Sequence, residues 1–134
     1  MSWHAVGLAA AAVMATLGGC APDETVSGYI DPDTTWQLIE YGGVAYDLPA
    51  TISFPHEGEV TGAGPCNRFN AVQNAPYPWV EIRQLASTRR ACPDLAAEQV
   101  YFEALERMTL VEATGGVLIL SDEDHLLMVF SPAH

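Results

Sequence analysis

A run of thirteen uncharged residues near the N-terminus, residues 5–17, constrains what the rest of the chain can fold into. The run is too short to span the hydrocarbon core of a bilayer, which takes about 20 residues of helix. An apolar run of this length that ends in small residues is typical of a cleavable export signal. We therefore expect residues 1–19 to be a signal peptide and the mature chain to fold in an oxidising compartment.

The apolar run leads into the motif LGGC, which ends at Cys20 and resembles the bacterial lipobox. The cysteine of a lipobox receives a diacylglyceryl group and becomes the first residue of the mature chain, so the resemblance implies a lipid anchor at Cys20. One departure is that the residues before the run, Met-Ser-Trp-His, lack the usual Lys or Arg. Because Ala21 rather than Asp follows the cysteine, the resemblance favours the outer membrane, with the protein facing the periplasm. The alternative is a buried N-terminal helix with an incidental cysteine.

Cleavage before Cys20 leaves enough residues for one domain with a core of its own. Residues 20–34 contain two prolines, one glycine and four acidic residues, a composition typical of a flexible tether. We expect the folded domain to occupy residues 35–134.

The net charge of the chain is −12, and all five basic residues are arginines. Such a surface repels phosphate backbones, so nucleic acid is not an expected partner. A cationic or neutral partner is more compatible with this charge, although acidity also serves simple solubility.

Cys66 and Cys92 are the two cysteines that remain once Cys20 carries lipid. An oxidising compartment pairs thiols unless something prevents it, so we expect a disulfide between them. A nucleophilic Cys66 would need a partnering base, and a zinc site would need Cys or His ligands about two to five residues apart. The sequence supplies neither context, but both uses remain as alternatives to the disulfide.

Alternation of apolar and polar residues predicts strands through most of the domain. We expect strands over residues 35–41 and 80–85, a hairpin over 51–54 and 59–62, and a three-stranded meander over 110–114, 117–120 and 126–130. Residues 94–108 instead follow a helical period, with one apolar stripe made of Leu95, Tyr101, Phe102, Leu105 and Met108. We expect this helix to cover one face or end of the sheet rather than to dock a partner helix.

Two motifs in this order, GxxxCNRF ending at Phe69 and STRxACP ending at Pro93, are similar to the signatures of the META domain, the family of the HslJ-like heat-inducible lipoproteins. Pro65 and Arg90 depart from the family pattern beside these motifs. The resemblance implies an α+β fold, a strongly curved and mainly antiparallel, barrel-like sheet with one amphipathic helix packed on it. It also implies an envelope location, a link to stress tolerance, motility or secretion, and no established enzymatic activity.

A disulfide between the two cysteines would bring four polar residues together: Asn67, Arg68, Thr88 and Arg89. These residues form a candidate binding patch for an anionic group on an otherwise acidic protein. The simpler interpretation, which we favour, is that Asn67 bonds the backbone of a tight loop while the arginines pair with acidic neighbours such as Glu98.

Two classes of function follow from these observations. The first is a non-catalytic, monomeric envelope lipoprotein that binds or shields an unidentified envelope component under stress. The second is a periplasmic inhibitor of a hydrolase, because an acidic domain would attract a cationic lysozyme. We expect no enzymatic activity, no cofactor and no metal, since no catalytic order of residues or phosphate-binding glycine loop occurs in the sequence.

Overall fold

The computed structural model describes residues 7, 9–12 and 21–134 of the chain. The predicted lipid attachment site at Cys20 lies outside the described residues, as does most of the predicted signal peptide over residues 1–19. Within the described part of the chain, no helix combines the length and the apolar character needed to cross a membrane.

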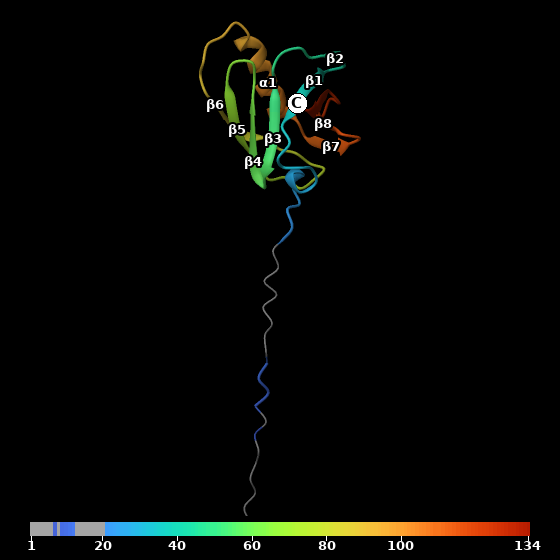
Figure 1. Ribbon diagram of the computed structural model, residues 1–134. Coiled ribbons are helices and arrows are strands. Elements are labelled where there is room, and N and C mark those ends of the chain that lie inside the picture. Colours follow the sequence, from blue (N-terminus) through green and yellow to red (C-terminus); the bar gives the residue numbers. More distant parts are fainter. Residues whose placement is uncertain (1–6, 8, 13–20) are drawn as a thin grey trace, which may run out of the picture.

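One antiparallel sheet of nine strands forms the domain, and it curls into a half-barrel (Figure 1). The strand order is β6-β5-β4-β3-β1-β9-β8-β7, with the short β2 paired to β1. The strands are β1 (Trp36–Tyr41), β2 (Val44–Ala45), β3 (Thr51–His56), β4 (Gly58–Ala63), β5 (Arg68–Gln73), β6 (Arg83–Ser87), β7 (Leu110–Thr114), β8 (Val117–Ser121) and β9 (Leu127–Pro132). The first and last long strands are neighbours, and their register places the buried Leu38 opposite the buried Phe130.

The one α-helix of the described chain, α1 (Leu95–Arg107), packs on the sheet with its apolar stripe inward. Tyr101 and Phe102 meet Phe69 of β5 edge-on, with ring centroids 6.3 and 5.2 Å apart. The hydroxyl of Tyr101 donates a hydrogen bond of 2.8 Å to the backbone oxygen of Thr51, and burial raises the pKa of this phenol well above 10.0. The predicted α+β fold with a curved sheet and one packed helix is confirmed, although Leu95 of the expected stripe is 44% exposed.

The predicted hairpin and the C-terminal meander are confirmed as β3–β4 and β7–β8–β9. The sequence interpretation missed β5, which directly follows the loop of Cys66. It also placed the next strand too early, since β6 begins at Arg83 rather than at residue 80. Val80 and Ile82 are nevertheless buried, so their alternation signals core positions that precede the strand.

Part of the predicted tether belongs to the folded domain. The 3-10 helix η1 (Val26–Gly28) buries Val26 in the hydrophobic core, at 1% exposure. The backbone N–H of Tyr77 donates a hydrogen bond of 2.7 Å to the oxygen of Glu24. The ring of Tyr29 stacks on the ring of Tyr77, with centroids 4.3 Å apart. The expectation that folded structure starts at residue 35 is therefore wrong, because this segment carries apolar side chains that the sheet buries.

The Asp23 carboxylate organises this N-terminal segment. It accepts hydrogen bonds from the backbone N–H and hydroxyl of Thr25 and from the hydroxyl of Ser27. Desolvation raises the pKa of Asp23, but the hydrogen bonds from Ser27 and Thr25 outweigh it and leave the pKa below its ordinary value of 3.8.

A depressed carboxyl pKa stabilises the docked segment at pH values above the ordinary value of 3.8, and this contribution is lost as the pH falls through the lower folded value. We expect hydrogen exchange at the amides of residues 25–29 to accelerate, relative to exchange at the amides of the sheet, on acidification through this range. The variant Asp23→Asn should show fast exchange in this segment with no such pH dependence. Exchange that is uniform across the domain at every pH would contradict the expectation.

Candidate functional site

The loop between β4 and β5 is fixed by a disulfide. Cys66 and Cys92 are joined, with their Cα atoms 5.8 Å apart, which confirms the predicted pairing. The bond links this loop to the segment immediately before α1. Cys66 is therefore a structural residue in this protein, and the alternatives of a thiol nucleophile and a metal ligand do not apply to the oxidised chain.

Glu98 lies on the buried face of α1, and its side chain binds the loop between β4 and β5. Its side chain is 2% exposed. One carboxylate oxygen accepts hydrogen bonds from the backbone N–H groups of Cys66 and Asn67, at 2.7 and 2.6 Å. The other oxygen accepts a bond of 2.6 Å from Nδ2 of Asn67. Gly64 is required here, because a Cβ at this position would lie 2.6 Å from Oε2 of Glu98.

Asn67 connects the disulfide loop to the residues that precede α1. Its Nδ2 also donates to the oxygen of Arg90 at 3.1 Å, and its Oδ1 accepts from the N–H of Arg90 at 2.6 Å. The hydroxyl of Thr88 donates to the same Oδ1 at 3.0 Å and accepts from the N–H of Arg68 at 3.2 Å. Asn67 does bond backbone groups, as predicted, but these groups belong to Arg90 in the segment before α1 and not to the loop of Asn67 itself. The predicted pairing of arginines with Glu98 is wrong, since that carboxylate is occupied by the loop.

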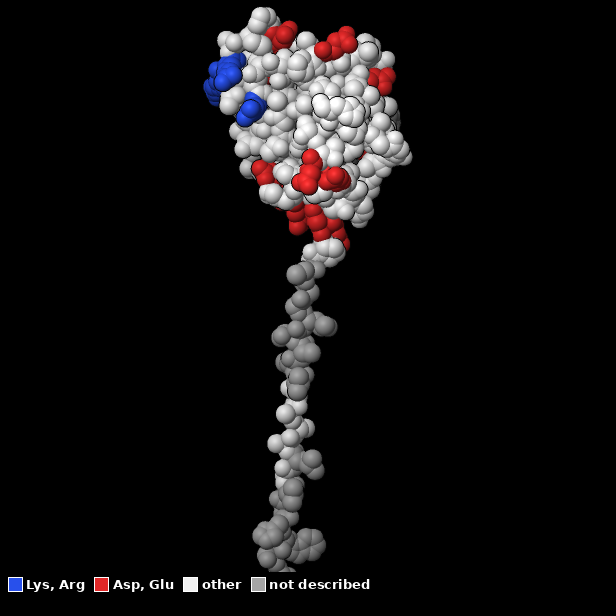
Figure 2. Space-filling view, viewed as in Figure 1, with Lys and Arg blue, Asp and Glu red and all other residues white. Residues whose placement is uncertain are grey.

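Arg68, Arg89 and Arg90 project from this scaffold into solvent. All three are exposed, and none forms a salt bridge with another described residue. We call Arg68, Thr88, Arg89 and Arg90 the arginine face. Figure 2 shows basic side chains gathered at the end of the domain away from η1, whereas acidic side chains lie at both ends, one group of them near the N-terminal segment. The four residues predicted as a polar patch do come together, with Asn67 beneath and the arginines outside.

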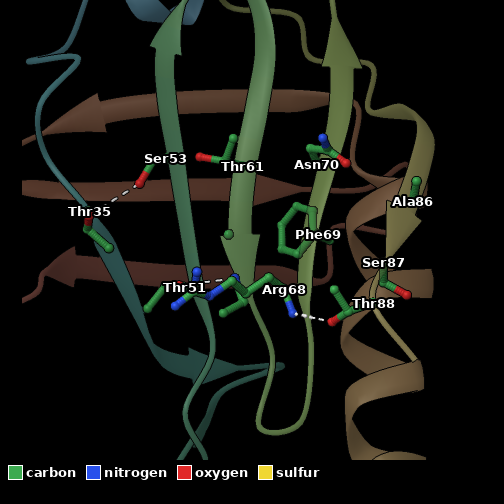
Figure 3. A pocket seen from close by; sticks show the side chains of 12 residues that line it. Thr35, Thr51, Ser53, Thr61, Arg68, Phe69, Asn70, Ala86, Ser87 and Thr88 are labelled. Carbon is green, nitrogen blue, oxygen red and sulfur yellow. Dashed lines mark hydrogen bonds between the residues drawn. The ribbon is translucent and has the colours of Figure 1, made fainter. Parts of the chain in front are cut away.

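A groove of about 800 Å³ adjoins the arginine face on the outer surface of strands β3 to β6 (Figure 3). The strand register aligns Ser53, Thr61, Asn70 and Ala86 in one row across these strands. A second row runs through Thr51, Ala63 and Arg68. The groove therefore presents hydroxyl and amide groups, with the Arg68 guanidinium and Thr88 at its end.

Some of these polar groups are occupied and others are free. The Thr51 hydroxyl accepts from the N–H of Ala63 at 3.2 Å, and the Ser53 hydroxyl is 3.4 Å from that of Thr35. Within the described residues, the side chains of Thr61 and Asn70 have no hydrogen-bond partner, and both line the groove. The groove can thus offer a ligand hydrogen bonds along its floor and a positive charge at one end. No group of acidic, His or Cys residues among those described is placed to hold a metal ion.

Sequence reasoning missed the role of Glu98 and the existence of the groove. A signal for Glu98 was present, because positions 98, 101, 102 and 105 follow the helical period, which puts an acidic residue on the apolar stripe. A charged side chain on a buried stripe requires several hydrogen-bond donors. The groove had no such signal, since its rows depend on the register between four strands, one of which was not predicted.

Comparisons with known proteins agree with this architecture. A family profile described as META domain matches residues 30–134. The fold is similar to the NMR structure of a protein from Burkholderia xenovorans, at 21% identity with a TM-score of 0.62, covering 86% of this chain and 93% of that one. It is also similar to the crystal structure of a DUF4847 family protein from Bacteroides vulgatus, at 17% identity with a TM-score of 0.63, covering 79% and 96%. Comparison with curated proteins gave no significant match.

Proposed function

This chain belongs to the META domain family, and from that premise we propose that it is a non-catalytic envelope lipoprotein that binds an anionic group of an envelope component through the arginine face. In this proposal the lipid at Cys20 holds the protein at the outer membrane, facing the periplasm. The binding serves envelope protection under stress.

The observation that carries the proposal is the position of three exposed arginines without acidic partners among the described residues of a chain whose net charge is −12. Among the arginines of the described residues, only Arg83 forms a salt bridge, with Glu81. Here Glu98, the nearest buried carboxylate, is turned to the disulfide loop instead. Arginine side chains bind carboxylate and phosphate through paired hydrogen bonds, so the face fits an oxyanion.

The fate of the motif residues supports binding rather than catalysis. Cys66 is held in the disulfide, and the side chain of Asn67 is used on both its oxygen and its nitrogen. These residues build the loop that carries Arg68, and they leave the guanidinium of Arg68 free to bind a ligand. The hydroxyl groove beside Arg68 suits the polar body of a sugar, so we infer that the oxyanion is carried on an envelope glycan.

The test is a titration of the isotope-labelled mature chain, followed by amide NMR shifts. The probes are N-acetylmuramic acid, which carries a carboxylate, and glucosamine 6-phosphate, with N-acetylglucosamine as the neutral comparison. We expect Arg68→Ala to weaken binding of the anionic sugars by about tenfold or more, because a charge-assisted hydrogen bond contributes about 1.5 to 3 kcal/mol. Arg107→Ala makes the same change in charge at the other end of α1 and should leave binding unaltered. Equal losses of affinity in both variants would show that net charge, and not the arginine face, causes the binding, and would contradict the proposal.

The acidic charge of the chain also favours the second candidate, an inhibitor of a cationic hydrolase. Co-incubation with a cationic lysozyme separates the two functions. An inhibitor would abolish lysozyme activity at a one-to-one ratio and in a salt-sensitive manner. A glycan-binding protein would leave the activity of the enzyme on a small soluble substrate unchanged.

A further inference from the structure

We propose that residues 23–29 act as a docked strap that holds the domain close to the bilayer, with the arginine face directed away from it. The inference rests on the proposed lipid anchor at Cys20 and specifies the source of the ligand. The face would then bind an anion in the aqueous compartment rather than a headgroup of the leaflet that anchors the protein.

The strap is built into the domain. Thr25, Val26 and Ser27 are all buried, at 5%, 1% and 8% exposure. Its backbone is hydrogen-bonded to the segment after β5 through Glu24 and Tyr77, and the ring of Tyr29 stacks on that of Tyr77. Undocking would return the buried Val26 side chain to water, so it has a substantial cost.

The internal geometry of the strap also opposes loosening. The carboxylate of Asp23 binds Thr25 and Ser27, which closes the segment on itself. The backbone returns so closely that a Cβ at Gly28 would lie 2.0 Å from the oxygen of Asp23. The chain is therefore ordered from Asp23 onward.

Very little chain separates this ordered segment from the proposed lipid site. Only Ala21 and Pro22 stand between Cys20 and Asp23. Three residue steps of fully extended chain span at most about 11 Å. A tether that ran to residue 34, as the sequence suggested, would have allowed the domain to turn freely. With the strap docked, only a short connection that contains Pro22 joins the domain to Cys20, and this limits how far the domain can turn.

The strap and the arginine face lie at opposite ends of the strands that join them. The segment bonded to the strap follows the end of β5 at Gln73, which pairs with Gly58 at the β3–β4 turn. Arg68 begins the same strand and pairs with Ala63. Five steps along a strand correspond to about 17 Å. Figures 1 and 2 agree, with η1 at one end of the domain and the basic side chains at the other.

This separation determines which anionic groups the arginine face can bind. At physiological ionic strength the Debye length is about 8 Å, so charges about 17 Å beyond the strap are largely screened from an anionic leaflet. The end near the strap instead carries the acidic residues of the segment, which anionic headgroups repel. Both effects leave the arginine face open to a ligand in the aqueous compartment.

The test uses the mature chain from residue 20, refolded with its disulfide and coupled through the thiol of Cys20 to a maleimide phospholipid in anionic vesicles that contain a dansyl-labelled headgroup. Energy transfer is measured from a single tryptophan. Trp36→Phe leaves Trp79 as the donor, which is exposed and two residues from Tyr77; the indole N–H removed with Trp36 has no partner. A second variant adds Trp79→Phe and Gln99→Trp, which moves the donor next to Arg89 and Arg90.

We expect severalfold stronger transfer from Trp79 than from the donor created by Gln99→Trp. Inserting ten Gly-Ser residues between Ala21 and Pro22 leaves the strap docked but lengthens the connection, and should make the two transfers converge. Gly28→Val should have the same effect by undocking the strap. Equal transfer from both donors in the uninserted chain, or a difference that survives the insertion, would overturn the proposal.

This design separates the strap from the anchor. The lipid is attached chemically, so the orientation is measured whether or not cells modify Cys20. The intact mass of protein extracted from membranes tests the modification itself. Absence of a lipid adduct would refute the proposed anchor, whereas equal transfer from the two donors would refute the strap.

Discussion

The variant Glu98→Ala should lower the free energy of unfolding by about 3 kcal/mol or more, measured by urea denaturation of the oxidised protein. Its carboxylate accepts three hydrogen bonds, from the N–H groups of Cys66 and Asn67 and from the Asn67 side chain. Removing it leaves the N–H groups of Cys66 and Asn67 without partners, and each such donor costs about 1 to 3 kcal/mol, whereas Nδ2 of Asn67 keeps its bond to the oxygen of Arg90. The lost side chain also leaves a cavity under the loop.

Two further variants make this result specific. Glu106→Ala removes an exposed carboxylate from the same helix and should change stability by less than about 0.5 kcal/mol. Glu98→Gln keeps the shape of the side chain but turns an amide donor toward other donors, so we expect a loss between those of the two alanine variants. A stable Glu98→Ala protein would show that the loop is held by the disulfide alone.

Removal of the disulfide should have an effect of similar size. The double variant Cys66→Ala/Cys92→Ala should lose roughly 3 to 4 kcal/mol, because the bond closes a loop with a sequence separation of 26 residues and restricts the unfolded chain. The measurement is urea unfolding of the double variant beside the oxidised and the reduced parent protein. Reduced parent and double variant should unfold at similar urea concentrations, and a double variant as stable as the oxidised parent would contradict the expectation.

The disulfide and Glu98 act on the same loop, so their effects should not add. We expect the triple variant to lose less than the sum of the separate losses, since a loop freed by one change no longer needs the other contact. A double-mutant cycle between the disulfide and Glu98 measures this coupling directly.

The fold was largely predictable because its signals are local. The meander and the helix follow from alternation and helical period in consecutive residues, and the disulfide was predicted from the cysteine count together with the expected export signal. The strand β5 was missed although its pattern alternates, because the motif before it contains Gly64, Pro65 and Asn67, residues typical of a turn. The strap was missed because Pro22 and the acidic residues dominate a composition that conceals one buried valine, Val26.

The candidate site was predicted only in part, for a physical reason. The sequence analysis grouped four residues only because the expected disulfide would bring them together: Asn67, Arg68, Thr88 and Arg89. The orientation of the arginines depends on where Glu98 points, and this is set by helix packing rather than by sequence neighbours. The hydroxyl groove depends on the register between neighbouring strands, which we could not predict from a single sequence.

The pairing of β1 with β9 has a consequence for how this protein is made. These strands lie at opposite ends of the domain in sequence, yet Leu38 and Phe130 face each other in its core. Synthesis proceeds from the N-terminus, so one edge of β1 stays unpaired until the last strand has been made. The sheet therefore closes only when the chain is complete, and a chain truncated before β9 would leave that edge open to aggregation.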